Sequence, residues 1–81
     1  MQLEDNNDIT VYFIFEKYNK KIYINANINE KLSKVISELI EKYNWLKHIR
    51  NLKFYLDKKL LDENKTLAEN GIQDDSEINI I

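Results

Sequence analysis

Three residue types that shape many small proteins are absent or scarce in this 81-residue chain. It contains no cysteine, no proline and a single glycine, Gly71. Without cysteine there are no disulfides and no thiolate metal ligands, so stability has to come from packing alone. A lone glycine cannot form the glycine-rich loop whose backbone amides approach a phosphate group. These absences disfavour nucleotide binding and a thiolate zinc site, and they fit a reducing compartment, the cytoplasm or the nucleus.

A strong charge of one sign and a long apolar run are missing too. The formal net charge is -2, which provides no basic field that would attract nucleic acid. The longest plainly apolar run, from Val11 to Phe15, is far shorter than the roughly 20 residues that span a bilayer. No signal-peptide pattern precedes it. We therefore expect neither nucleic acid nor a membrane as the main partner.

The residues needed for catalysis are also scarce. His48 is the only histidine, and without a cysteine beside it no nucleophile–base pair of the thiol type can form. Asp62 and Glu63 lie in a polar stretch with no apolar pocket to perturb them. The acidic residues of segment 74–77 lack the spacing of a calcium-binding loop. We expect no enzyme, no metal and no cofactor.

What the chain does have is enough apolar content for one small domain, 43% against 32% charged residues. Residues 1–8 are mostly polar and lack periodicity, which predicts a disordered lead-in. Residues 9–81 contain no internal repeat, linker or low-complexity tract. They are expected to form a single domain.

Two segments near the start alternate with the period of a β-strand. In residues 9–16, every second residue is apolar and falls on one face, and residues 21–27 repeat the pattern. The polar connector between them lacks glycine and proline, so Asn19 is the best candidate for a positive φ angle. The pair predicts an antiparallel hairpin.

One helix is predicted in the middle of the chain, from about Asn29 to Tyr43. Its apolar residues recur at helical spacing, as Leu32, Val35, Ile36, Leu39, Ile40 and Tyr43. Asn29 is the expected N-cap. Asn44 is expected to end the helix in the left-handed conformation, and Trp45 to fold back on the last turn.

The last part of the chain returns to short strands. Residues 52–56 alternate and are followed by a turn at Asp57-Lys58, after which Leu60-Leu61 can form only a very short strand. Segment 66–69 fits a capping box that starts a single helical turn. Gly71 should end that turn with a positive φ, before a final strand over residues 77–81.

The chain resembles the ubiquitin family, most clearly over LKFYLDKKLLDENKTLAENGIQDDSEINII, residues 52–81, which align without gaps. The most specific spacing joins the tetrapeptide 59–62, the tripeptide 65–67 and Gly71-Ile72-Gln73. The resemblance implies an α+β fold of the ubiquitin-like β-grasp type. Its mixed sheet would have four to five strands, with one main helix across one face and a short helical turn before the last strand.

The resemblance also implies roles for single residues. Tyr55 matches the centre of the family's hydrophobic recognition patch, and Ile81 matches another member of it. Lys59 matches a lysine used for chain branching, although an ordinary solvated lysine beside a turn is the simpler interpretation in a lysine-rich chain. Six positions match the family's core: Phe54, Leu61, Leu67, Ile72, Ile78 and Ile80.

The sheet face opposite the helix is the predicted protein-binding surface. Outward positions of the strands carry several apolar residues, with Lys53 at the edge of the group: Tyr12, Ile14, Tyr23, Tyr55 and Ile81. Tyrosines suit an interface because each has a large apolar ring and a hydroxyl that tolerates water. The alternative is that these are scattered exposed apolar residues, which are normal on soluble proteins.

Three functions fit these features. The first is a monomeric, non-conjugated ubiquitin-like module of a larger protein, which docks onto ubiquitin receptors, proteasome subunits or a specific partner. The second is a modifier truncated before its Gly-Gly tail, since the chain given stops at Ile81 and as such should form no thioester with an activating enzyme. The third is a β-grasp domain that pairs an edge strand with a small GTPase, for which Lys17, Lys20 and Lys21 supply a weak basic face.

Overall fold

The computed structural model describes residues 7–81 of the chain, and this part begins with two long antiparallel strands. β1 (Asp8–Phe15) pairs with β2 (Lys20–Asn27), and Tyr12 lies opposite Tyr23. A 3-10 turn, η1 (Glu16–Tyr18), connects them. Asn19 completes the connector with a φ of 53°, as the sequence predicts.

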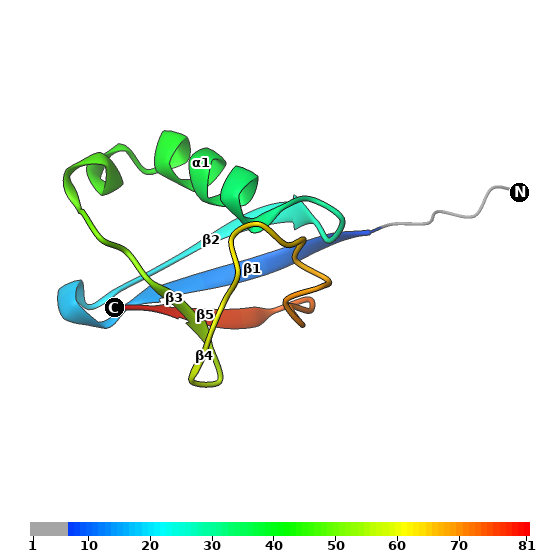
Figure 1. Ribbon diagram of the computed structural model, residues 1–81. Coiled ribbons are helices and arrows are strands. Elements are labelled where there is room, and N and C mark those ends of the chain that lie inside the picture. Colours follow the sequence, from blue (N-terminus) through cyan, green and yellow to red (C-terminus); the bar gives the residue numbers. More distant parts are fainter. Residues whose placement is uncertain (1–6) are drawn as a thin grey trace, which may run out of the picture.

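Three shorter strands complete the sheet: β3 (Phe54–Leu56), β4 (Lys59–Leu60) and β5 (Ser76–Ile80). The strand order is β2-β1-β5-β3-β4. β5 runs parallel to β1 and antiparallel to β3, so the last strand of the chain lies in the middle of the sheet (Figure 1). The turn between β3 and β4 uses Asp57 and Lys58, both with positive φ. The predicted mixed sheet is confirmed, with five strands in the described residues.

One helix, α1 (Leu32–Lys42), crosses one face of this sheet (Figure 1). Its buried residues are Leu32, Val35 and Leu39, so the predicted apolar stripe is confirmed. The predicted start is wrong. Lys31 occupies the N-cap position without a side-chain hydrogen bond, and Asn29 instead donates its backbone N–H to the Asn27 side chain, at 2.8 Å.

The end of the helix also differs from the prediction. Asn44 is not left-handed: it opens a second 3-10 segment, η2 (Asn44–His48). Leu46 in this segment is buried in the core, with 1% of its surface exposed. The segment is therefore held by tertiary packing, and the Trp45 ring lies against Phe15, with ring centroids 5.3 Å apart.

The segment before β5 contains the predicted capping box. The Thr66 N–H donates to Glu69 Oε1 at 2.9 Å, and the Glu69 N–H donates to Thr66 Oγ1 at 3.0 Å. This is the reciprocal pair of a capping box. It closes a single hydrogen-bonded turn that ends at Gly71, whose φ is 79°.

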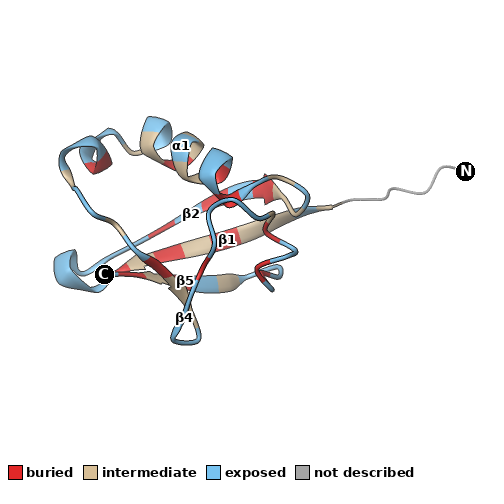
Figure 2. Ribbon diagram, viewed as in Figure 1, coloured by how far each residue is buried: buried red, intermediate tan, exposed pale blue. Residues whose placement is uncertain are grey.

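The core lies between α1 and the sheet, and Figure 2 shows buried positions alternating with less buried ones along the long strands. The six matched family positions, Phe54, Leu61, Leu67, Ile72, Ile78 and Ile80, are all buried. Most of the predicted lead-in 1–8 lies outside the described residues, but Asp8 already belongs to β1. Within residues 7–81, no helix is long and apolar enough to cross a membrane.

Candidate protein-binding surface

The face of the sheet turned away from α1 is defined by the strand register. One row across it contains Tyr23, Tyr12 and Glu77. The next row contains Lys21, Ile14, Asn79, Tyr55 and Leu60. Beyond the second row, Lys53 and Ile81 exchange backbone hydrogen bonds of 3.4 and 3.1 Å. All six predicted residues therefore lie on neighbouring strands or at their ends.

The β1–β2 half of this face combines two aromatic rings with an ion pair. The rings of Tyr12 and Tyr23 lie 6.2 Å apart, centroid to centroid. Lys21 Nζ lies 4.9 Å from the centroid of the Tyr12 ring and 3.1 Å from Glu77 Oε2. The ammonium group and its partner thus shield part of the Tyr12 ring, which makes this half less available to an apolar partner.

The β3–β5 half is more exposed. Leu60 is 57% exposed and Ile81 is 73% exposed, whereas Tyr55 is half-buried. Tyr55 and Ile81 line one shallow hollow together with Glu16, Lys58 and Asn79. We call Tyr55, Leu60 and Ile81 the β3–β5 group. It is apolar at its centre and has charged and amide groups at its border.

The register explains how the predicted residues are grouped. Glu77 and Asn79 project from β5, the central strand, and lie between the β1–β2 tyrosines and the β3–β5 group. The apolar side chains therefore form two groups on one face. Sequence reasoning missed Leu60, which lies directly opposite Tyr55. The strand that contains Leu60 has only two residues, too few for an alternating pattern to show which face of the sheet its side chain is on.

Lys59 and His48 have ordinary surroundings. Lys59 is exposed on β4, directly after the turn at Asp57 and Lys58. His48 is exposed at the end of η2. Within residues 7–81, no three His, Cys, Asp or Glu side chains gather where they could hold a metal ion. Every buried side-chain nitrogen or oxygen in the same residues has a hydrogen-bond partner.

A five-stranded mixed sheet with a parallel central pair and one helix across a single face defines a ubiquitin-like β-grasp domain. The family described as "Ubiquitin-2 like Rad60 SUMO-like" matches residues 9–81. The chain belongs to this family, within the ubiquitin-like class that its sequence resembles.

Solved structures agree on the fold. One similar chain comes from a structure described as "Molecular Mimicry of SUMO promotes DNA repair", with a TM-score of 0.80 and 13% identity, covering 96% of this chain and 95% of that one. Another is the solution structure of a ubiquitin-like domain from an Arabidopsis thaliana protein. It has a TM-score of 0.78 and 23% identity and covers 95% of this chain and 79% of that one. No curated protein sequence matches in the corresponding comparison.

Proposed function

We propose that this domain is a protein-interaction module, not an enzyme, and that it docks onto its partner through the outer face of the sheet. The observation that carries the proposal is the β3–β5 group. Leu60 and Ile81 are largely exposed; Leu60 lies opposite Tyr55, and Ile81 lines the same shallow hollow as Tyr55. Tyr55 and Leu60 lie in paired strands, and backbone hydrogen bonds with Lys53 hold Ile81 next to them, which lowers the conformational entropy cost of binding.

The composition of the face supports a protein partner. An apolar centre bordered by Lys53, Lys58 and Glu16 has the pattern of a small interface, in which a few apolar or aromatic side chains supply the affinity and the border excludes water. Tyr55 is suited to the centre because its ring offers apolar area and its hydroxyl can stay hydrated.

The partner is proposed to be a receptor for ubiquitin-like or SUMO-like proteins, with receptors of the proteasome as one option. Support comes from the family and from the similar chain whose structure is described as "Molecular Mimicry of SUMO promotes DNA repair". In this proposal the domain acts as a monomer in the cytoplasm or nucleus and presents a modifier-like surface within a larger protein.

A modifier is the second candidate function, because the same fold serves both roles. The reading frame beyond Ile81 distinguishes the two. A Gly-Gly end, and a thioester formed with ATP and a cognate activating enzyme by the chain carrying that end, would favour the modifier. A continuation into a further domain would favour the interaction module.

Pairing of an edge strand with a small GTPase has less support. β2 is an edge strand, but the Tyr43 hydroxyl donates to the Tyr23 carbonyl at 3.1 Å. This bond occupies a backbone acceptor of β2 that an added strand would need. Lys21, one of the three lysines of the basic face, is paired with Glu77.

The test is Tyr55→Ser. We expect the affinity for a purified receptor to fall by about 2 kcal/mol, roughly thirtyfold, because the variant removes the ring at the centre of the β3–β5 group. Titrations of the ¹⁵N-labelled wild type and variant with a purified proteasomal ubiquitin receptor and with a purified SUMO-binding protein measure this affinity.

Glu41→Ser, an exposed change on the outer surface of α1, is the matched control and should leave affinity unchanged. Equal affinities of wild type and Tyr55→Ser, with partner-induced shifts on the outer surface of α1, would overturn the assignment to the sheet face.

A further inference from the structure

A pocket of about 450 Å³ opens at one end of the sheet, away from Tyr55 and Leu60. Three segments form it: the end of β1 with η1, the loop 48–52, and the end of β5. We propose that this pocket is a second binding site, which takes one bulky apolar side chain of an acidic peptide segment.

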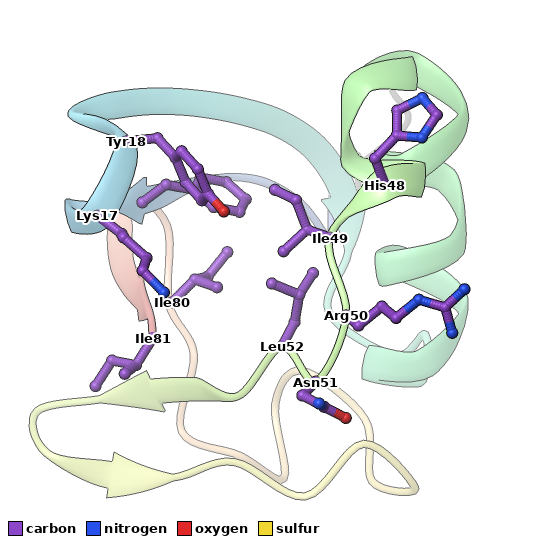
Figure 3. A pocket seen from close by; sticks show the side chains of 10 residues that line it. Lys17, Tyr18, His48, Ile49, Arg50, Asn51, Leu52, Ile80 and Ile81 are labelled. Atoms are coloured by element: carbon purple, nitrogen blue, oxygen red, sulfur yellow. The ribbon is translucent and has the colours of Figure 1, made fainter.

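The inner wall of the pocket is apolar. Phe15 and Ile80 belong to the buried core, and Ile49 and Leu52 pack against that core while remaining partly exposed. Figure 3 shows Tyr18, Ile49, Leu52 and Ile80 converging on the centre of the pocket. Its volume lies within the range of roughly 300–1,000 Å³ typical of ligand sites. A leucine or phenylalanine side chain fits such a space.

The charge around the pocket determines which segment it prefers. Its ten lining residues include the cationic Lys17 and Arg50 and no Asp or Glu side chain. In a chain with a formal net charge of -2, this is a local concentration of positive charge. Lys17 lines the pocket, and Figure 3 shows Arg50 and His48 pointing away from its centre. Lys17 and Arg50 can therefore meet acidic residues that flank a buried apolar side chain.

The walls are held in place before any ligand arrives. Trp45 packs on Phe15 at 5.3 Å between ring centroids. Directly after the loop 48–52, Lys53 exchanges two backbone hydrogen bonds with Ile81, which follows β5, of 3.1 and 3.4 Å. Asn51 reverses the loop with a φ of 59°. A preformed pocket of this kind avoids part of the entropy cost of binding.

The pocket can be tested separately from the outer face of the sheet. Ile81 borders both, but Tyr55 and Leu60 do not line the pocket. Tyr55→Ser should therefore leave peptide binding at the pocket intact, and loss of the pocket's cations should leave the β3–β5 group intact.

The experiment titrates the ¹⁵N-labelled 81-residue chain with three short synthetic peptides. In the first, aspartates flank a single leucine; in the second, alanine replaces the leucine; in the third, lysines replace the aspartates. We expect the first peptide to shift the amide signals of residues 15–18, 48–52 and 80–81, and the other two to bind at least about tenfold more weakly. Added salt should weaken the first complex.

Arg50→Glu and Lys17→Glu should each weaken binding of the first peptide by about fivefold or more, and the exposed, remote Lys65→Glu should not. Dispersed amide spectra establish that each variant is folded. The proposal is overturned if the first peptide does not bind, if the alanine or lysine peptide binds as tightly, or if the shifts map to another surface.

Discussion

Within residues 7–81, Asn70 has a side chain that makes several hydrogen bonds at once. It is only 9% exposed, and its Oδ1 accepts from the Asp62 N–H at 2.8 Å. Its Nδ2 donates to the carbonyls of Asp62 at 2.9 Å and Thr66 at 3.0 Å, with a longer contact of 3.4 Å to Lys65. A single amide thus closes the loop between β4 and the capping-box turn.

Replacing this amide tests that role. Asn70→Ala should lower the free energy of unfolding by about 1–3 kcal/mol, because the partly buried Asp62 N–H loses its acceptor and the Asp62 and Thr66 carbonyls each lose one of two donors. Urea denaturation measures the change. Asn64→Ala is the control, since Asn64 is exposed in the same loop, and it should stay within about 0.5 kcal/mol of wild type. Equal stabilities of the two variants would contradict the closing role of Asn70.

At the scale of elements, the first turn of α1 is hydrogen-bonded to a loop that lies about 30 residues further along the chain. The N–H groups of Leu32 and Ser33 donate to the carbonyls of Lys65 and Glu63, at 2.9 and 3.0 Å. In return, the Leu67 N–H donates to the Glu30 carbonyl at 2.9 Å. A distant loop therefore satisfies donors that a side-chain N-cap usually satisfies. This explains why Lys31 can occupy the N-cap position.

Truncating a buried side chain of the same helix should lower stability by a larger amount. Leu39 is 1% exposed at the centre of its buried face, so Leu39→Ala should cost about 2–5 kcal/mol through lost burial and a residual cavity. Thermal and urea melts measure this loss, which for a small domain is a large part of total stability. The exposed Glu41→Ala on the same helix should change little. A melting shift of a degree or two for Leu39→Ala would mean that the helix packs in another register.

At the scale of the whole molecule, sheet, helix and η2 share a single core. Phe13 of β1 contacts Phe54 of β3 at 6.1 Å between ring centroids, and Leu46 of η2 belongs to the same buried cluster as Leu39 of α1. Among the described residues, these elements have no separate cores that could unfold independently. We therefore expect one cooperative transition.

The only tryptophan provides the measurement. Trp45 reports on the packing of η2 against Phe15, whereas far-UV circular dichroism reports on helix and sheet together. The two signals should give the same denaturation midpoint in urea. An earlier fluorescence transition would show that η2 detaches first, and it would also weaken the case for a preformed pocket beside it.

The sequence by itself determined the local elements. Period-two alternation predicted the hairpin, helical spacing predicted α1, and single residues with special backbone freedom marked turns at Asn19 and Gly71. The capping box at 66–69 formed its reciprocal bonds as expected. These features succeed because their chemistry acts over a few neighbouring residues, so the information is contained in one short segment.

Only the tertiary structure decided the rest. The cap of α1, the bonds of Asn70 and the burial of Leu46 all depend on residues brought together by folding. The same is true of the surfaces: the insertion of β5 between β1 and β3 places Glu77 and Asn79 between the two apolar groups, and the pocket exists only where three distant segments meet. Each arrangement depends on long-range contacts and strand register, which local periodicity does not specify.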